Sequence, residues 1–403
     1  MSLNSTPSAE RLHIGFFGMR NAGKSSLVNA VSGQELSVVS EVKGTTTDPV
    51  KKAMELLPLG PVVIVDTPGL DDEGELGEKR VKKAREILAR IDIAVLVVDS
   101  WTGLQDQDTE LISLFQSRKL PWLLAYTKAD LLVSRPAVPN NAVYVSAKTG
   151  ENITVLKEML GSFAKDLENS KKLVSDLLSP GDLVVLVIPI DESAPKGRLI
   201  LPQQQVMRDV LDAHCSFCAC QDTELPELLA SLQKKPRMVI TDSQAFGRVS
   251  KNTPEDIDLT SFSILFARYK GSLEALVKGA SALSSLKDGD RVLISEGCTH
   301  HRQCNDIGSV KMPGWIESFT GVKPEYVFSS GNSFPEDLSG YSLIVHCGGC
   351  MLNEKEMKYR IRRAEDSGVP IVNYGIAIAH MHGILRRSLS VFPEVLQLLV
   401  ART

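Results

Sequence analysis

Short apolar runs alternate with stretches of helical character over the first part of the chain. Runs of β-branched residues separated in this way are typical of a parallel sheet whose strands are joined by crossover helices. We therefore expect one α/β domain over residues 1–170, closed by a helix around Leu156–Leu173. The expected strands are His13–Phe17, Val62–Asp66, Ile93–Val98, Trp122–Tyr126 and Ala142–Val145.

A Ser-Pro-Gly breaker at residues 179–181 precedes a second block of alternating elements. A helix is predicted from Pro202 toward Ala213, because proline is favoured in the first turn of a helix. The expected strands of this block are Asp182–Ile190, Met238–Thr241 and Phe262–Ala267. The pattern predicts a small α/β domain over residues 171–270.

A third block begins near Leu273 and again alternates apolar runs with helical stretches. Its expected strands are Arg291–Ser295, Glu325–Phe328, Ser342–His346 and Val369–Asn373. They predict another parallel sheet over residues 271–403. The expected fold class is α/β throughout, in three successive domains.

Composition narrows the choice of function. The chain has 403 residues, a formal net charge of -4 and 5% aromatic residues, which does not suit a dedicated nucleic-acid binder. Residues 1–11 lack the apolar core of a signal peptide, and the apolar runs are too short to span a membrane, so we expect a cytoplasmic protein without a membrane partner. The seven cysteines are expected to be thiols or metal ligands rather than disulfides.

The residues from Gly18 to Ser25 match a phosphate-binding loop, since they follow an apolar strand and lead into a helical stretch. Glycines allow the backbone N–H groups to turn toward phosphates, and the dipole of the following helix favours the same anion. Lys24 is expected to reach the β- and γ-phosphates, and Ser25 to ligate Mg²⁺. The expected nucleotide contacts of the loop are Gly18, Asn21, Ala22, Gly23, Lys24, Ser25 and Ser26.

Two further segments match the switches of a nucleotide hydrolase. The sequence Asp-Thr-Pro-Gly at residues 66–69 ends an apolar strand, so Asp66 is expected to bind Mg²⁺ through water and the N–H of Gly69 to face the γ-phosphate. Thr46 lies between the phosphate-binding loop and this segment, where we expect its hydroxyl to close on Mg²⁺. The residues expected to take part in hydrolysis are therefore Lys24, Thr46, Asp66 and Gly69.

Base choice is predicted from two motifs that each follow an apolar strand. In the first, which comprises Thr127, Lys128 and Asp130, the carboxylate of Asp130 can accept both N1–H and N2–H of guanine. In the second, Ser146-Ala147-Lys148, the N–H of Ala147 can donate to guanine O6. The expected nucleotide is GTP.

These motifs resemble those of small GTPases, and residues 12–165 look like the Era/TrmE branch of that superfamily. The resemblance implies a potassium ion at Asn21, which matches the asparagine of potassium-activated members. Leu70 stands where Ras-like proteins place a water-orienting glutamine. Thr127 replaces the usual asparagine, so we expect a weaker bracing hydrogen bond there.

A second set of candidate ligands follows two strands of the third block. Cys298 and His300 come after the strand at 291–295, and Cys347 and Cys350 come after the strand at 342–346. In a parallel sheet both segments reach the carboxyl edge, where open α/β sheets build their sites. Three thiolates fit a [4Fe–4S] cluster, and three thiolates with one histidine also fit zinc, so the ligand pattern leaves iron and zinc open.

Cys-x-His followed by Cys-x-x-Cys, on the carboxyl side of such a GTPase domain, resembles the HydF family of [FeFe]-hydrogenase maturation GTPases. The resemblance implies that Cys298, Cys347 and Cys350 hold a [4Fe–4S] cluster, with His300 as a fourth ligand that varies within the family. It also implies a homodimeric scaffold that receives a transient di-iron precursor from radical S-adenosylmethionine enzymes and passes it to apo-hydrogenase. Residues 1–170 would then be the P-loop GTPase domain, 171–270 the dimerisation domain and 271–403 the cluster domain.

Two other functions remain open on sequence. One is an RNA- or ribosome-associated Era-like GTPase with a structural zinc site, and the other is a redox enzyme that uses a cluster for electron transfer. His301 and Cys304 are candidates for replacement ligands, and residues 355–363 are expected to form the solvated face of a helix. His380 and His382 are expected to be surface or core histidines. A helix end with partly buried thiols is expected at Cys215, Cys218 and Cys220, with a metal site at these residues as the alternative.

Overall fold

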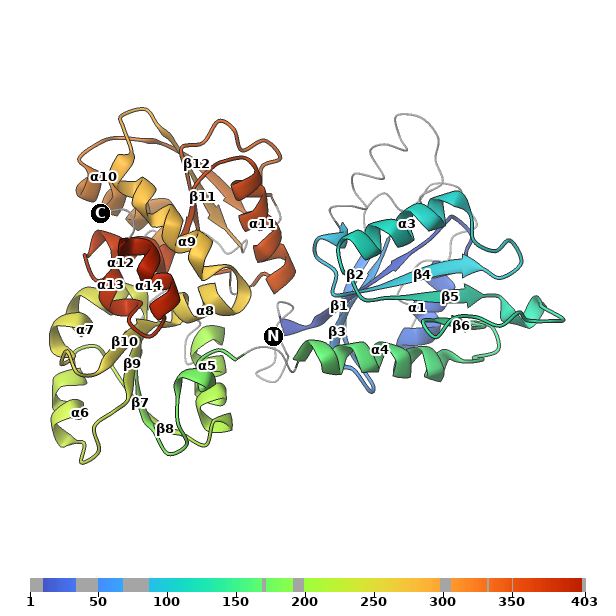
Figure 1. Cartoon of the computed structure of the whole chain (residues 1–403), viewed down its shortest axis with the longest axis horizontal. Coiled ribbons are helices and arrows are strands. Elements are labelled where there is room, and N and C mark those ends of the chain that lie inside the picture. Colours follow the sequence, from blue (N-terminus) through green and yellow to red (C-terminus); the bar gives the residue numbers. More distant parts are fainter. Residues whose placement is uncertain are drawn as a thin grey trace. The chain divides into compact units, whose positions relative to one another are not determined.

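The computed structural model describes residues 10–33, 50–67, 87–168, 172–190, 199–297, 306–331, 333–349 and 351–400. The chain divides into two compact units, Met1–Ser170 and Lys171–Thr403 (Figure 1). The described parts of both units are of the α/β class, as the sequence predicts. No helix in the described ranges is long and apolar enough to cross a membrane.

The first unit is built around a six-stranded sheet, counted over its described residues, in the order β2-β3-β1-β4-β5-β6. All neighbouring strands run parallel except β2, which pairs antiparallel with β3. The antiparallel strand was not predicted, because its exposed, lysine-containing edge lacks the apolar run that marks the central strands. The strands are β1 (Leu12–Phe17), β2 (Val50–Leu56), β3 (Gly60–Asp66), β4 (Ile93–Asp99), β5 (Trp122–Thr127) and β6 (Ala142–Tyr144).

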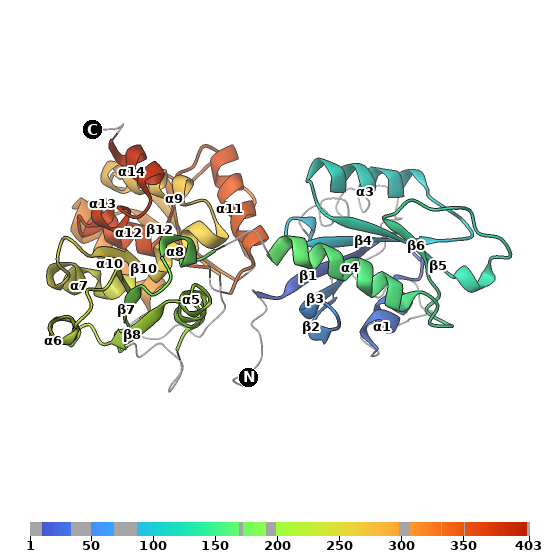
Figure 2. The same ribbon diagram turned by 60° about the horizontal axis from the view of Figure 1, so that its bottom comes forward.

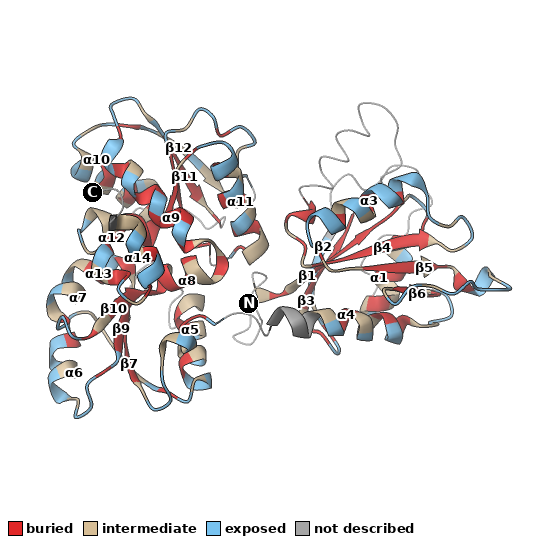
Figure 3. Cartoon of the chain, viewed as in Figure 1, coloured by how far each residue is buried: buried red, intermediate tan, exposed pale blue. Residues whose placement is uncertain are grey.

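Helices cover both faces of this sheet. Helices α1 (Lys24–Ser32) and α4 (Ile153–Glu168) pack on one face, and α3 (Asp106–Ser117) packs on the other (Figure 2). Side chains of the central strands therefore contribute to two apolar cores, one on each face. Because β4 is buried on both faces, it reads as a continuous apolar run rather than an alternating one (Figure 3).

The second unit contains two parallel sheets that share one continuous apolar core in the described residues. The first sheet has the order β10-β9-β7-β8 and the second the order β12-β11-β13-β14. The strands are β7 (Leu183–Val187), β8 (Ser216–Cys220), β9 (Met238–Thr241), β10 (Asp258–Ser261), β11 (Arg291–Glu296), β12 (Glu325–Ser330), β13 (Leu343–His346) and β14 (Ile371–Asn373).

Helices connect and cover these sheets. They are α5 (Leu201–Asp212), α6 (Leu225–Ser231), α7 (Phe246–Asn252), α8 (Phe262–Lys270), α9 (Leu273–Ala280), α10 (Met312–Thr320), α11 (Glu354–Asp366), α12 (Tyr374–Met381), α13 (Leu385–Ser388) and α14 (Pro393–Val400). Helix α8 lies between the two sheets, where it contacts α5 on one side and α9, α11 and α12 on the other (Figure 1).

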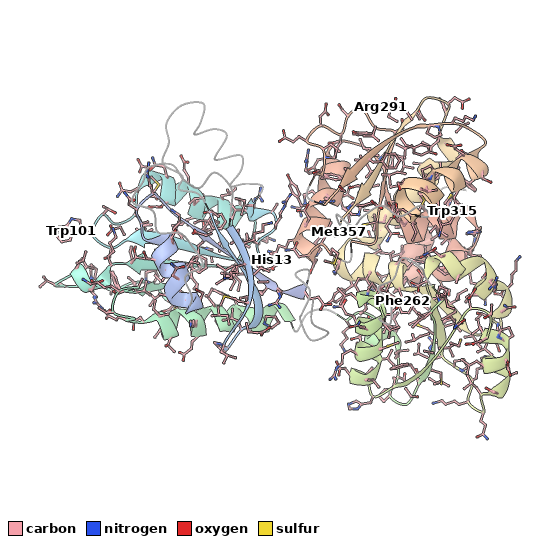
Figure 4. The ribbon with its side chains drawn as sticks, turned by 180° about the vertical axis from the view of Figure 1, so that it is seen from behind. His13, Trp101, Phe262, Arg291, Trp315 and Met357 are labelled. Atoms are coloured by element: carbon pink, nitrogen blue, oxygen red, sulfur yellow. The ribbon has the colours of Figure 1, made fainter. Side chains whose placement is uncertain are left out.

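The predicted strand Phe262–Ala267 is wrong, because these residues form the first turns of α8. Ser261 ends β10 and accepts the N–H of Ile264 with its side chain at 3.2 Å, which starts the helix. Phe262, labelled in Figure 4, and its neighbours are buried around most of the helix. Burial on several sides removes the helical period from the sequence, so the segment reads as a buried strand.

The predicted helix end at Cys215, Cys218 and Cys220 is also wrong. Residues 216–220 form β8, the edge strand of its sheet, which pairs parallel with β7.

Burial, with smaller contributions from nearby acidic groups, raises the pKa of Cys220 to about 11, so its thiol stays protonated at neutral pH. Within the described ranges, no three His, Cys, Asp or Glu side chains gather as a metal site.

Candidate functional site

The phosphate-binding loop and its partner residues lie at one edge of the first sheet. Strand β1 ends at Phe17, Phe16 pairs with Asp66, and Asp99 pairs with Thr127. Because these strands are parallel, their carboxyl ends reach the same edge. The sheet therefore brings the loop at 18–23, Asp66 and Thr127 together from three separate parts of the sequence.

Close packing explains the glycine that opens the loop. Gly18 has a φ of 143°, and a Cβ atom placed there would lie 2.1 Å from the carbonyl oxygen of Val97. Any larger residue would displace the loop from β4. The loop then leads directly into α1, whose first-turn N–H groups and dipole are suited to a phosphate.

Lys24 is held over this loop. Its Nζ donates to the carbonyls of Gly18 at 2.9 Å and Met19 at 2.6 Å, and the residue is only 8% exposed. These contacts keep an ammonium group at the loop that would surround the phosphates. The position suits the predicted role of Lys24 toward the β- and γ-phosphates.

The residues expected to hold Mg²⁺ are adjacent. The hydroxyl of Ser25, in the first turn of α1, donates to Oδ2 of Asp66, the last residue of β3, at 3.0 Å. Oδ1 of Asp66 is buried and has no hydrogen-bond partner among the described residues. Because a buried carboxylate oxygen is costly to leave unpaired, and Mg²⁺ prefers oxygen ligands, this pair fits the ion.

Thr127 braces the phosphate-binding loop. Its hydroxyl donates to the carbonyl of Ala22 at 2.5 Å, with the carbonyl of Val98 at 3.2 Å, and the residue is buried. The sequence suggested a weaker brace where threonine replaces asparagine. The shorter side chain nevertheless reaches the loop, because Gly23 passes close to it without a Cβ of its own.

Thr127→Val should weaken nucleotide binding. The substitution keeps the shape of the side chain but leaves the Ala22 carbonyl without its donor, which costs about 1.4 kcal/mol, or about tenfold in Kd. Titration with a fluorescent GDP analogue measures the change. Thr109→Val, on the exposed face of α3, is the matched control, and equal affinities of the two variants would contradict the brace.

Residues expected to recognise the base also lie at this edge. The hydroxyl of Ser146 donates to Oδ1 of Asp130 at 2.7 Å and lowers the pKa of that exposed carboxyl below its usual value. Asp130 therefore stays ionised and able to accept the N–H groups of guanine. Lys128 forms an ion pair at 2.6 Å with Asp99, the last residue of β4. Of the two residues that follow Ser146 in the sequence, Ala147 is partly buried and Lys148 is exposed.

Thr46, Gly69 and Leu70 lie outside the described residues. Their expected positions at the γ-phosphate and Mg²⁺ therefore stay predictions.

The cysteine motifs follow two adjacent strands of the third sheet. Strands β11 and β13 run parallel, and Ser295 pairs with His346, so both end at the same level. The N–H of Gly297 donates to Sγ of Cys347 at 3.0 Å, and that of Gly349 donates to the same sulfur at 3.4 Å. Cys347 therefore lies against the residue that immediately precedes Cys298 in the sequence.

A tight turn follows Cys347. Gly349 has a φ of 63°, and a Cβ atom there would lie 2.5 Å from Sδ of Met357 on α11, labelled in Figure 4. Only glycine fits this conformation and this contact. The turn aims the N–H of Gly349 at the Cys347 sulfur, beside the N–H of Gly297 from the end of β11. Two N–H groups at one sulfur stabilise a thiolate and suit a metal–thiolate site. Cys298, His300, His301, Cys304 and Cys350 lie outside the described residues.

A buried polar network beneath Cys347 was missed by sequence reasoning. Arg360 is fully buried, although residues 355–363 were expected to face solvent. Its guanidinium bonds Nε2 of His346 at 3.0 Å, the carbonyl of Gly331 at 2.6 Å and the carboxylate of Glu356 at 2.8 Å. Glu356 and Arg360 are four residues apart in a charged helix. Because ion pairs on exposed helices have the same spacing, the sequence does not distinguish this buried pair from a surface one.

His346 connects this network to the cysteine. Burial, and then the charge of Arg360, lower the pKa of His346 to about 3, so its ring is neutral. Nε2 then accepts from Arg360, and Nδ1–H donates to the carbonyl of Cys347 at 2.7 Å. The arrangement fixes the backbone at the end of β13.

Three family models match consecutive parts of the chain. The model of the 50S ribosome-binding GTPase matches residues 13–128, that of the hydrogen maturase F dimerization domain residues 173–271, and that of the hydrogen maturase F tetramerization domain residues 274–391. The chain thus carries a P-loop GTPase domain, and the domains that follow it imply self-association.

Individual proteins are similar to this chain over its GTPase part. The tRNA modification GTPase MnmE of Legionella pneumophila (strain Paris) is 37% identical over 155 residues, which are 38% of this chain and 34% of that protein. GTPase Der of Kosmotoga olearia is 34% identical over 128 residues, 30% of this chain and 29% of that protein. The chain therefore spans about a third of the length of these relatives.

Among solved structures, Aquifex aeolicus Era bound to GDP and AlF4- is 17% identical, with a TM-score of 0.34, over 80% of this chain and 94% of that one. So low a similarity supports no inference about function. The two hydrogen maturase F models, by contrast, follow the GTPase match in order and together cover more than half of the 403 residues, so the chain belongs to the hydrogen maturase F (HydF) family of hydrogenase maturation GTPases.

Proposed function

We propose that this protein is a GTP-hydrolysing scaffold that binds a [4Fe–4S] cluster and delivers a di-iron precursor to apo-[FeFe]-hydrogenase. The observation that carries the proposal is the environment of Cys347, whose sulfur accepts two backbone N–H groups at the carboxyl edge of the third sheet. One of these N–H groups belongs to the residue before Cys298. Membership of the hydrogen maturase F family supports iron over zinc at these thiols.

Three cysteines would hold the cluster. Cys298, Cys347 and Cys350 supply thiolates to three irons, which leaves one iron for His300 or for an exchangeable ligand. When bound, the cluster supplies an iron that can take up or release an outside ligand. The N–H groups of Gly297 and Gly349 would moderate the charge on the Cys347 sulfur, and the network of His346 and Arg360 would hold its backbone in place.

GTP hydrolysis has a separate role in this proposal. Lys24 meets the β- and γ-phosphates, Ser25 and Asp66 hold Mg²⁺, and Asn21 contributes to a potassium site. Thr46 and Gly69 respond to the γ-phosphate. Because none of these residues belongs to the sheets of the second unit, hydrolysis would change contacts with partners rather than supply cluster ligands.

The proposed partners are the proteins that would supply and receive the di-iron precursor. Radical S-adenosylmethionine enzymes would load the di-iron precursor, and apo-hydrogenase would receive it. Self-association through residues 171–270 would make the working unit at least a homodimer.

The metal content of the protein tests this proposal. Protein purified without oxygen should be brown and contain iron and sulfide in equal amounts, because a [4Fe–4S] core holds one sulfide per iron. Metal and sulfide analysis, with electron paramagnetic resonance of the reduced sample, gives the answer. A colourless protein with zinc would instead favour an Era-like GTPase with a structural zinc site.

A further inference from the structure

Lys270 is an unusual residue in the interior of the second unit. It is the last residue of α8, and only 3% of it is exposed. Burial of an ammonium group is costly unless other groups compensate it. The end of a helix offers part of that compensation, because the helix dipole is negative there.

The ammonium of Lys270 bonds the segment that carries the second cysteine pair. Its Nζ donates to the carbonyl of Leu352 at 3.2 Å and lies 5.5 Å from the centre of the Phe266 ring. Leu352 is 82 residues away in the sequence and belongs to the tetramerization-domain match, whereas α8 belongs to the dimerization-domain match. The contact therefore joins two family domains within one compact unit.

Leu352 in turn touches both cysteine-bearing segments. Its N–H donates to the carbonyl of Gly349 at 3.0 Å, in the turn that follows Cys347. Its side chain packs so closely on Gly297 that a Cβ atom there would lie 2.8 Å from Cγ of Leu352. Gly297 donates to the Cys347 sulfur and immediately precedes Cys298. A shift of Leu352 would therefore displace both the segment of Gly297 and the turn at Gly349.

Charge gives Lys270 a second effect. Three thiolates around a [4Fe–4S] core leave a net negative charge, and reduction by one electron increases it. Nζ of Lys270 bonds the carbonyl of Leu352, which is two positions after Cys350 in the sequence. A buried cation beside the ligand segment stabilises the reduced form more than the oxidised form, because charges interact strongly where water is excluded. The reduction potential is then higher with the cation than without it.

We propose that Lys270 is a positioning residue of the iron–sulfur site, which α8 of the dimerization domain supplies to hold Leu352 and to offset the charge of the cysteine-bound cluster. The inference rests on the proposed function, since it requires a cluster at Cys298, Cys347 and Cys350. The cluster site of the tetramerization domain is incomplete without its neighbouring domain.

Redox titration of the full-length protein, followed by electron paramagnetic resonance, tests this inference. Lys270→Met should shift the midpoint potential to a lower value and lose iron faster to a chelator than the wild type does. Lys270→Gln, which can still donate to the Leu352 carbonyl, should shift the potential in the same direction but retain iron better. Lys278→Met, the same change at an exposed position of α9, should match the wild type in both measurements.

The outcomes separate the two proposals. Wild-type protein without iron and sulfide would overturn the proposed function, and this inference with it. Wild-type protein with a cluster whose potential neither Lys270 variant shifts would overturn this inference alone. If Lys270→Met does not fold, the potential of Lys270→Gln decides the effect of the charge.

Discussion

Lys24→Ala should abolish GTP hydrolysis. The ammonium of Lys24 is held over the phosphate-binding loop by the carbonyls of Gly18 and Met19, where phosphate charge develops during hydrolysis. Removal of one such group lowers kcat by about 10²–10³-fold in enzymes that stabilise charge in this way. Phosphate release in the presence of Mg²⁺ and GTP measures the loss.

Lys52→Ala provides the control for that variant, because Lys52 is an exposed lysine of β2 in the same unit. It should hydrolyse GTP at the wild-type rate. The iron content of Lys24→Ala should equal that of the wild type, since Lys24 lies in the first compact unit and the cysteines lie in the second. Hydrolysis by Lys24→Ala at the wild-type rate would remove Lys24 from the nucleotide site.

Cys347→Ala should strip the cluster while GTP hydrolysis continues. The sulfur of Cys347 accepts N–H groups from Gly297 and Gly349, and without it the site keeps only two of its three anchoring thiolates. Cys298→Ala and Cys350→Ala should have the same effect. His300→Ala should retain a [4Fe–4S] centre with an altered spectrum, because three cysteines suffice to hold it. Iron and sulfide analysis after anaerobic reconstitution measures each outcome.

Cys218→Ala is the matched control, since Cys218 lies in β8 of the other sheet. It should bind as much iron as the wild type. A loss of iron from Cys218→Ala as large as that from Cys347→Ala would show that the cluster ligands have been assigned to the wrong sheet.

The sequence predicts most strands of this fold because their signal is local. Strands β4 and β13 are apolar runs followed at once by polar residues, so both the strand and the edge where its motif lies can be read directly. The same reasoning predicts that Ser25 and Asp66 lie close together and that Cys347 lies at a carboxyl edge. The structure shows both for these described residues. A parallel sheet supplies the geometry once the strands are known.

What the sequence did not reveal depends on contacts between distant segments. The sequence predicts a strand where α8 lies, because the helix is buried between two sheets and burial on several sides hides the helical period. Arg360 was expected in solvent because a Glu–Arg pair four residues apart is common on exposed helices. The hydrogen bond from Thr127 to the carbonyl of Ala22 joins residues 105 positions apart, so no local sequence pattern predicts it.

Maturation of apo-[FeFe]-hydrogenase tests the central claim most directly. Apo-hydrogenase is incubated with the radical S-adenosylmethionine enzymes, GTP and either the wild type, Cys347→Ala or Lys24→Ala, and hydrogen evolution is then measured. The wild type should produce active hydrogenase. Cys347→Ala should fail although it hydrolyses GTP, and Lys24→Ala should fail although it binds iron and sulfide. Full hydrogenase activity with Cys347→Ala would contradict the claim that this protein carries the precursor on a cluster held by its cysteines.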